Sequence, residues 1–160
     1  MGSLLAIDPG QSMGWAYWNK ASKKPSWPDA MGVERTHGDS WTQQVMDQCL
    51  NFRIGVPSKD VDQVVCELPE YFATSVKGHA VASKQGLVKL TCIVGAIMGV
   101  CQFRRISVRV VPVREWKGQM KKETVKLRIL RRLPGLDDHP DFHHDAIDAV
   151  GIGGFHMGWF

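Results

Sequence analysis

The sequence predicts an α/β fold built on a mixed five-stranded sheet. Two apolar runs, residues 4–7 and 64–66, each end in an acidic residue, as expected of central strands that are buried on both faces. The residues after the first run are rich in aromatic side chains typical of antiparallel strands, and apolar residues later recur at helical spacing. We therefore expect three antiparallel strands, then two parallel ones, flanked by helices.

Turn and cap signals set the approximate bounds of each element. Pro9 and Gly10 predict a type II turn after the first strand, with Gly10 at positive φ, and residues 39–40 offer a helix cap. The expected strands cover residues 4–8, 14–18, 30–36, 61–68 and 107–113, and the expected helices cover residues 41–53, 80–103, 121–133 and 143 to 151 or beyond.

The length and composition favour one soluble domain over residues 1–160. The chain has 44% hydrophobic and 22% charged residues, which are the proportions of an ordinary globular protein and exclude extensive disorder. Its four cysteines have no CxxC spacing and lie in apolar runs, so we expect reduced, buried thiols and no structural zinc. With no secretion signal in the sequence, we expect a cytoplasmic protein.

The charge is distributed unevenly. Residues 104–132 contain 11 of the 20 Lys and Arg residues against two acids, whereas residues 133–160 contain five Asp and no Lys or Arg. Binding of a polyanion beside a cation site would require such a pair of segments. A solvated helix face is the structural alternative for the basic segment.

Four carboxylates form the candidate site. Asp8 and Glu67 both end buried strands, and they would lie side by side if those strands are neighbours. Asp8 could instead cap its own turn. Asp145 and Asp148 are three residues apart on the last helix among apolar neighbours, where they need a counter-charge; the helix dipole alone could explain Asp145. Four oxygen ligands suit two Mg²⁺ or Mn²⁺ ions, which would support phosphodiester hydrolysis.

The helix expected over residues 80–103 is apolar around much of its circumference. Such a helix is either buried inside the domain or shared with a partner, and for a domain of this size we favour a two-fold homodimer. Its uncharged run, residues 90–100, is too short to span a bilayer, so we expect no membrane segment.

Three motifs together resemble those of RuvC-type Holliday junction resolvases, in the ribonuclease H-like superfamily. They are Ile7-Asp8-Pro9-Gly10 with Gly14, then Cys66-Glu67, and then Asp145-Ala146-Ile147-Asp148-Ala149. The resemblance implies a homodimer that resolves four-way DNA junctions by paired symmetric nicks, leaving 5′-phosphate and 3′-hydroxyl ends. It also implies that Asp8, Glu67, Asp145 and Asp148 are catalytic metal ligands for Mg²⁺ or Mn²⁺.

The resemblance extends to the DNA-binding residues. RuvC proteins have an aromatic residue shortly after the second carboxylate, and here Tyr71 and Phe72 follow Glu67 at an offset position. His144 is either a helper at the site or a plain helix-start residue. The basic residues expected to contact DNA are Lys84, Arg114, Lys117, Lys121 and Lys122.

Other functions remain open at the level of sequence. A nuclease of the same fold could prefer flaps, forks or RNA/DNA hybrids. A non-catalytic architectural DNA-binding protein would explain the basic segment but not the four acids. An actin-like ATP-binding protein would need a second subdomain, for which 160 residues leave no room.

Overall fold

The computed structural model describes residues 2–10, 12–35, 40, 43–47, 61–70 and 84–160. Its sheet has the order β3-β2-β1-β4-β5, with β1 in the centre. β2 is antiparallel to both β1 and β3, while β4 is parallel to β1 and β5 is parallel to β4. The strands are β1 Leu4–Asp8, β2 Ser12–Trp18, β3 Ala30–Arg35, β4 Gln63–Leu68 and β5 Ser107–Pro112. The predicted mixed sheet is confirmed.

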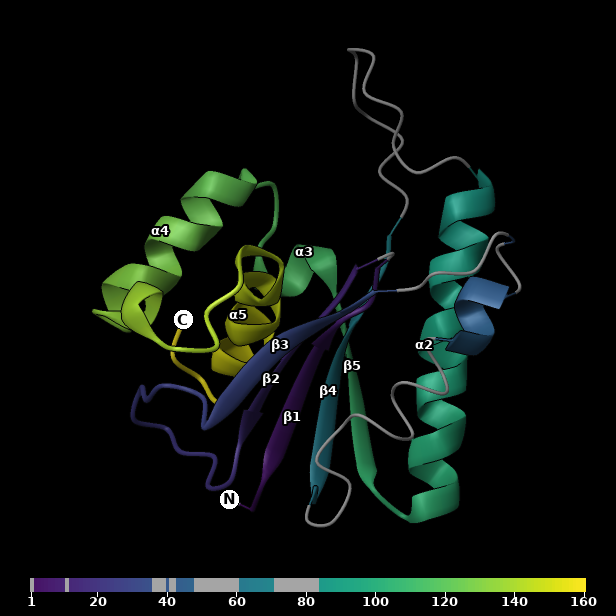
Figure 1. Ribbon diagram of the computed structural model, residues 1–160, viewed down its shortest axis with the longest axis horizontal. Helices are drawn as coiled ribbons and strands as arrows, with labels where there is room; N and C mark the ends of the chain where they lie inside the picture. Colours follow the sequence, from purple (N-terminus) through teal and green to yellow (C-terminus); the bar gives the residue numbers. More distant parts are fainter. Residues whose placement is uncertain (1, 11, 36–39, 41–42, 48–60, 71–83) are drawn as a thin grey trace.

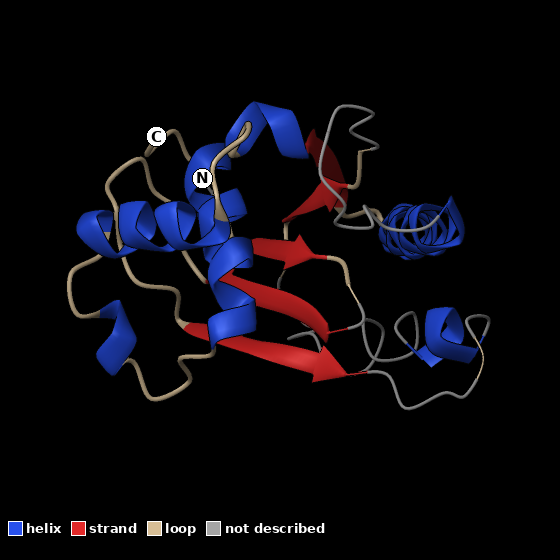
Figure 2. Cartoon of the chain, turned by 90° about the horizontal axis from the view of Figure 1, so that it is seen from above, coloured by secondary structure: helices blue, strands red, loops and turns tan. Residues whose placement is uncertain are grey.

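Helices cover both faces of this sheet (Figures 1 and 2). The helix α2 lies on one face, and α4 and α5 lie on the other, with the short α3 following β5. Two 3-10 turns, Leu136–Asp138 and His144–Ala146, precede α5. The helices are α2 Lys84–Arg104, α3 Val113–Trp116, α4 Lys122–Arg132 and α5 Ile147–His156.

The two faces of β1 contribute to separate apolar cores. Leu4 and Ala6 pack with residues of α4 and α5, whereas Leu5 and Ile7 pack with residues of α2. Successive side chains of a strand point to opposite faces, which explains this division. An apolar side chain is needed at every position of β1, so its sequence has no polar residue before Asp8.

Several expected details differ from the structure. Gly10 does not have a positive φ, so the predicted type II turn is wrong; the register pairs Asp8 with Gly14, which leaves a longer connection than a tight turn. The last helix does not begin at residue 143, because residues 144–146 form a 3-10 turn before α5. The predicted helix over 41–53 is described only at residues 43–47, which are helical.

The helix α2 is partly exposed. Ile93, Val94 and Ile97 are buried against the sheet, but Val88, Met98 and Phe103 are exposed, Phe103 at 90%. By length and composition alone, residues 86–104 are apolar enough to cross a membrane, which is weak evidence for a membrane segment. This stretch is longer than the uncharged run of residues 90–100, because it also includes the charged residues Lys89 and Arg104.

The cysteines agree only partly with expectation. Cys66 and Cys101 are buried free thiols, as predicted. Cys92 is also free but lies on the exposed side of α2, so the expectation of burial was wrong for this residue. An apolar run around a cysteine does not show which side of the helix faces the sheet. The remaining cysteine, Cys49, lies outside the described residues.

Candidate active site

The first two carboxylates lie at the ends of adjacent strands. The parallel register pairs Ile7 of β1 with Cys66 of β4, so Asp8 and Glu67 follow as neighbours. Ala6 and Val65, two residues earlier on each strand, contribute to the core beneath α5. By strand alternation, Asp8 and Glu67 therefore project on the face that α5 covers. The sequence prediction that these two acids lie side by side is confirmed.

The third carboxylate comes from α5. Asp148 lies in the first turn of this helix and is buried, with 8% of its surface exposed. Its Oδ1 is buried and has no hydrogen-bond partner among the described residues. An unpaired buried carboxylate oxygen is unfavourable unless a cation or a water molecule satisfies it.

Asp145 pairs with a different lysine from the other carboxylates. It belongs to the 3-10 turn directly before α5 and not to α5 itself, so the two acids lie in two consecutive elements and not in the single helix that was predicted. Its Oδ1 is 3.6 Å from Lys122 Nζ, and its backbone N–H donates to His143 Nδ1 at 3.1 Å.

The absence of a side chain at Gly14 allows the turn that carries Asp145 to approach the sheet. A Cβ atom at Gly14 would lie 2.3 Å from the backbone oxygen of Asp145 and 3.2 Å from Ala146 Cα. The same residue of β2 pairs with Asp8 in the antiparallel register. Gly14 therefore brings the backbone of Asp145 against the strand next to Asp8, although the side chain of Asp145 extends to Lys122.

Lys117 supplies the positive charge among the buried carboxylates. Its Nζ lies 3.4 Å from Glu67 Oε2 and 3.3 Å from Asp148 Oδ2. Lys117 follows α3 and is only partly exposed, so it lies inside the site as well as in the basic segment. The neighbouring Trp116 donates its indole Nε1–H to Glu67 Oε2 at 2.7 Å.

Burial and mutual repulsion shift the pKa values of the carboxyl groups in the site. Burial raises the pKa of Asp8 well above its usual range, and the charges of Glu67 and Asp148 raise it further. Burial also raises the pKa of Glu67, against the opposing effects of Lys117 and the Trp116 hydrogen bond. For Lys117, burial lowers the pKa, but the surrounding carboxylates outweigh this and leave it raised. Like charges in a buried site are unfavourable without a matching counter-charge.

The donor set fits a hard divalent cation. Asp8, Glu67 and Asp148 offer only oxygen atoms, which Mg²⁺ and Mn²⁺ prefer, and the unpaired Asp148 Oδ1 needs a partner. Within the described ranges, however, no three His, Cys, Asp or Glu side chains are grouped closely enough to hold a metal ion. Lys117 provides the counter-charge in this arrangement.

The remaining predicted site residues lie around these carboxylates or beyond the described chain. His144 is exposed and contacts the Phe142 ring and Lys126 Nζ. Arg114 is exposed, but its Nε lies 3.2 Å from Glu70 Oε1 and its backbone N–H donates to Glu70 Oε2. Lys84 begins α2. Tyr71 and Phe72 lie outside the described residues.

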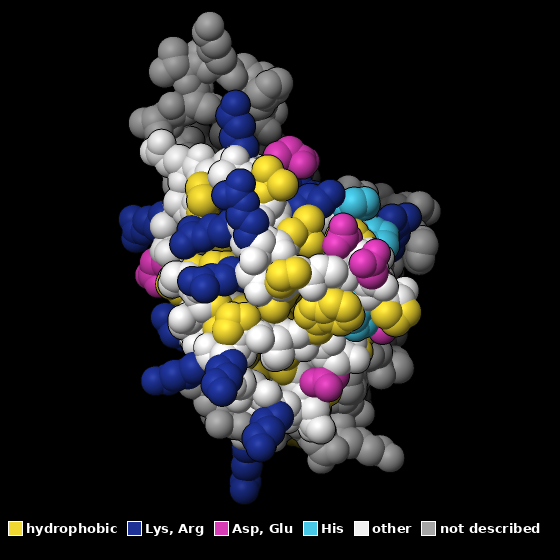
Figure 3. All heavy atoms as spheres, turned by 90° about the vertical axis from the view of Figure 1, so that its left-hand side faces the viewer, with side chains coloured by type: hydrophobic (Ala, Val, Ile, Leu, Met, Phe, Trp, Pro, Cys, Tyr) yellow, Lys and Arg dark blue, Asp and Glu magenta, His cyan; other side chains and the backbone are white. Residues whose placement is uncertain are grey.

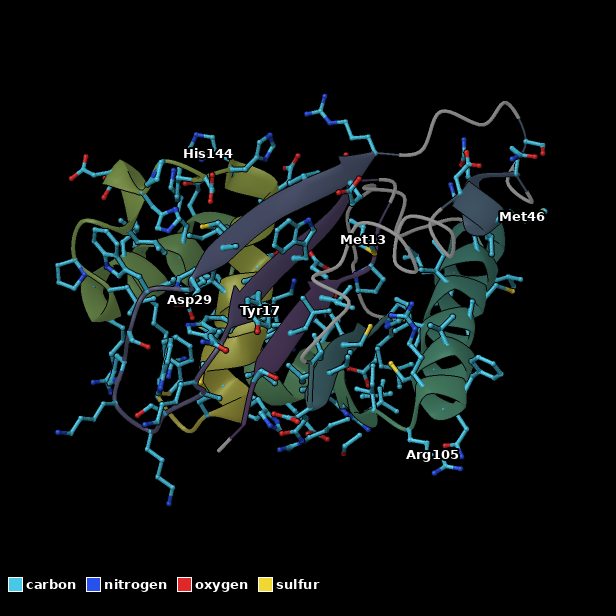
Figure 4. The ribbon with its side chains drawn as sticks, turned by 60° about the horizontal axis from the view of Figure 1, so that its bottom comes forward. Met13, Tyr17, Asp29, Met46, Arg105 and His144 are labelled. Carbon is cyan, nitrogen blue, oxygen red and sulfur yellow. The ribbon has the colours of Figure 1, made fainter. Side chains whose placement is uncertain are left out.

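The basic segment divides between two places. Lys and Arg side chains are spread over the face formed by α4 (Figure 3), where the exposed residues include Lys121, Lys122 and Arg128. Arg104 instead ends α2 and Arg105 follows it, and Figure 4 shows Arg105 there, on the other side of the sheet from His144. Within this segment, Lys117 pairs with Glu67 and Asp148, and Lys122 pairs with Asp145.

Sequence reasoning missed two contacts of the site. The sequence holds one signal for Trp116, which is its position just after the predicted fifth strand and beside Lys117, from where it can reach the same strand ends. Glu70 had no signal, because its partner Arg114 is 44 residues away in the chain.

The fold and the strand-end carboxylates define a class. A sheet of order 3-2-1-4-5, with acids at the ends of its first and fourth strands and a third acid on the final helix, is an α/β fold of the ribonuclease H-like kind. The predicted fold class is thereby confirmed.

Comparisons with solved structures specify this fold further. The RuvC of Thermus thermophilus in complex with a Holliday junction substrate matches with a TM-score of 0.70 and 16% identity, over 98% of this chain and 92% of that chain. A second Thermus thermophilus RuvC structure matches with a TM-score of 0.61 and 18% identity, over 96% and 92% of the two chains. The fold is therefore that of the RuvC-type resolvases.

A more distant structure has the same architecture. The yeast mitochondrial Holliday junction resolvase Ydc2 matches with a TM-score of 0.54 and 8% identity, over 98% of this chain and 79% of that chain. No family model matches the sequence, and no curated protein matches it significantly. The likeness is thus visible in the fold more clearly than in the sequence.

Proposed function

We propose that this protein is a metal-dependent, structure-selective DNA endonuclease that resolves Holliday junctions. The observation that carries the proposal is the convergence of Asp8, Glu67 and Asp148 around Lys117 on a RuvC-type fold. A likeness to the Thermus enzyme bound to its junction substrate supports the choice of substrate. We place the protein on DNA in the cytoplasm.

In this proposal, Asp8, Glu67 and Asp148 hold Mg²⁺ or Mn²⁺, and Asp145 turns toward the site as a fourth ligand. When bound, two such ions would neutralise the acids, polarise the phosphate and lower the pKa of the attacking water. Lys117 leaves its carboxylate partners to bind the phosphate oxygens. The exposed cations at the start of α4, among them Lys122 and the preceding Lys121, bind the DNA backbone beside the site. The products have 5′-phosphate and 3′-hydroxyl ends.

Cleavage of a synthetic four-way junction tests the proposal. The wild-type protein should introduce paired nicks in the presence of Mg²⁺ and none in its absence. Asp8→Asn should abolish nicking while junction binding persists, because the amide removes a ligand charge without changing the side-chain size. Cleavage retained by Asp8→Asn would refute the assignment. Flap, fork and RNA/DNA-hybrid substrates run in parallel would separate a junction resolvase from a broader nuclease.

One observation favours a second candidate. Lys117 already neutralises part of the acid group, and no three described acids are grouped for a metal ion. A non-catalytic DNA-binding protein would keep this internal counter-charge permanently. Titration calorimetry with Mn²⁺ distinguishes the two, because the nuclease should bind the ion and the architectural protein should not.

The α4 surface should make DNA binding sensitive to salt. Each phosphate neutralised by a lysine or arginine releases counterions, so affinity falls as salt rises. The double substitution of Lys121 and Arg128 by Gln should weaken binding and reduce the salt slope by about two phosphate contacts. Leu127→Gln on the same exposed surface is the uncharged control. An unchanged slope in the double variant would exclude α4 as the DNA surface.

We further propose that α2 mediates a two-fold homodimer. Its outer side has no charged residue from Val88 to Met98 other than the partly buried Lys89, which donates a hydrogen bond to Gln44. Two aligned active sites would then account for paired nicks. Sedimentation of the wild type and of Met98→Glu tests this proposal, because a charge on the outer side should produce monomers. A wild-type protein that sediments as a monomer would contradict it.

A further inference from the structure

The indole ring of Trp116 lies at the junction of three structural elements. Trp116 ends α3, is only 5% exposed, and donates its Nε1–H to Glu67 Oε2 at the end of β4, at 2.7 Å. A hydrogen bond to an ionised carboxylate is shorter and stronger than one between neutral groups. This contact fixes the orientation of the Glu67 carboxylate from one side.

The same ring lies beside the site's internal cation. Lys117 Nζ is 4.8 Å from the Trp116 ring centroid, within the range of a cation–π contact. The ammonium group therefore has three kinds of neighbour: the ring, Glu67 Oε2 and Asp148 Oδ2. Glu67 Oε2 receives both the indole N–H and the Lys117 charge, so the ring and the lysine share one carboxylate oxygen.

The α5 helix holds the ring in place. Gly151 follows Asp148 by three residues, and a Cβ atom added there would lie 2.6 Å from Trp116 Cζ3 and 2.9 Å from Ile129 Cδ1. Residues three apart share a helix face, so Gly151 is next to Asp148 on α5. Because position 151 has no side chain, the ring packs directly against the helix that carries the third carboxylate.

We propose that Trp116 is a positioning residue that sets the relative placement of Glu67, Lys117 and Asp148, and thereby the affinity of the site for a divalent cation. This inference rests on the proposed function. Trp116 acts through its indole N–H and its ring and does not contact DNA or the reacting phosphate. A tryptophan that only fills the core would affect stability but would leave metal affinity unchanged.

The first experiment compares two tryptophan variants. Trp116→Phe keeps an aromatic ring beside Lys117 but removes the N–H. Trp159→Phe is the matched control, because Trp159 is equally buried and donates its indole N–H to the Ser22 carbonyl at 2.9 Å. The measurements are the Mg²⁺ concentration for half-maximal junction cleavage and the Kd for Mn²⁺ alone by calorimetry.

We expect Trp116→Phe to raise both metal values by about 10- to 100-fold, the usual effect of removing a hydrogen-bond partner of a metal ligand. Trp159→Phe should leave both values unchanged, although it loses the same type of hydrogen bond. Equal metal affinity in wild type and Trp116→Phe would overturn the inference while leaving the proposed function intact. A wild-type protein that neither binds Mn²⁺ nor cleaves the junction would overturn both.

A second measurement needs neither metal nor activity. In a ¹⁵N-labelled, metal-free sample, the Trp116 indole N–H should resonate downfield and exchange slowly with solvent, since it donates to a charged acceptor. Glu67→Gln should move this resonance upfield, whereas Glu70→Gln, at the carboxylate that pairs with Arg114, should not. An indole signal that does not respond to Glu67→Gln would refute the contact on which the inference is built.

Gly151→Ala reaches the same ring from the opposite side. The added methyl group must displace Trp116, so this variant should raise the metal requirement although neither Glu67 nor Trp116 is substituted. A folded Gly151→Ala protein with wild-type metal affinity would contradict the positioning role.

Discussion

The two ends of the β1–β4 pair use acidic residues in opposite ways. At the start of these strands, the exposed Asp62 accepts hydrogen bonds from the Ser3 N–H at 2.8 Å and the Ser3 hydroxyl at 3.1 Å. Ser3 Oγ accepts the Asp62 N–H in return at 2.9 Å. This end therefore contains one carboxylate that accepts two hydrogen bonds from Ser3, and no second acid takes part in these contacts.

At the other end of the same strands, several acidic side chains lie close together and are buried. Asp8, Glu67 and Asp148 interact as like charges, and Asp148 Oδ1 has no partner in the described chain. Lys117 and the Trp116 N–H offset only part of this repulsion. One end is arranged for stability, and the other keeps unfavourable interactions that a bound cation would relieve.

Gly14→Ala should have the largest effect, because it disturbs the carboxylate end alone. The new Cβ would force the backbone of Asp145 away from β2. We expect a loss of cleavage of about 100-fold, since a displacement of about 1 Å is sufficient for that. Overpacking should also reduce the free energy of unfolding by about 1–3 kcal/mol. Junction cleavage and urea unfolding measure the two effects.

Gly32→Ala is the matched control for this change. Its Cβ would meet the side chain of Trp15, 2.8 Å from Cζ2, and that side chain contributes to the core on the α2 face. The variant should be destabilised but fully active per folded molecule. If Gly32→Ala lost cleavage as severely as Gly14→Ala, the special role of the Gly14 contact would be excluded.

Asp62→Ala tests the stable end and should have a moderate effect. Removal of the carboxylate deprives Ser3 of its acceptor and should lower the free energy of unfolding by about 1–2 kcal/mol. Urea unfolding measures this loss. Cleavage should be unchanged, because Asp62 lies at the opposite end of β4 from Glu67. A strong loss of cleavage in a folded variant would contradict the proposal that the Asp62 end of β4 contributes to stability and only the Glu67 end contributes to cleavage.

Asp8→Asn should have the smallest effect on stability, and of opposite sign. The amide removes one charge from a group in which burial and like charges raise the pKa of Asp8, so the metal-free protein should gain about 1 kcal/mol, or roughly 2–4 °C in Tm. Thermal unfolding in EDTA measures this increase in Tm. A lower Tm in this variant would mean that the acid pairs favourably in the metal-free fold.

The pH dependence of the metal-free protein follows from the same shifts. Because the pKa values of Asp8 and Glu67 are raised in the folded state, that state binds more protons than the unfolded chain above about pH 4. Their contribution to stability therefore falls as pH rises through the raised values. Asp8→Asn should reduce this slope in thermal melts recorded without metal.

The sequence alone determined the sheet and two of its site residues. In a central strand, an acid can follow an apolar run only where the chain leaves the core. Asp8 and Glu67 could therefore be placed at strand ends from the sequence. Their adjacency follows because the two strands are parallel neighbours. The periodicity also predicted the α4 helix, whose buried residues Val125 and Ile129 are four apart.

Only the tertiary structure decided how the charges pair. Lys117, Glu67 and Asp148 lie far apart in the chain, and no local pattern reports that one ammonium group reaches both acids or that Trp116 donates to Glu67. The placement of Asp145 in a 3-10 turn is equally non-local, because the backbone of this turn packs against Gly14 of β2. Periodicity reports which face of an element is buried, whereas the packing of α3 and α5 on the strand ends determines which charges meet.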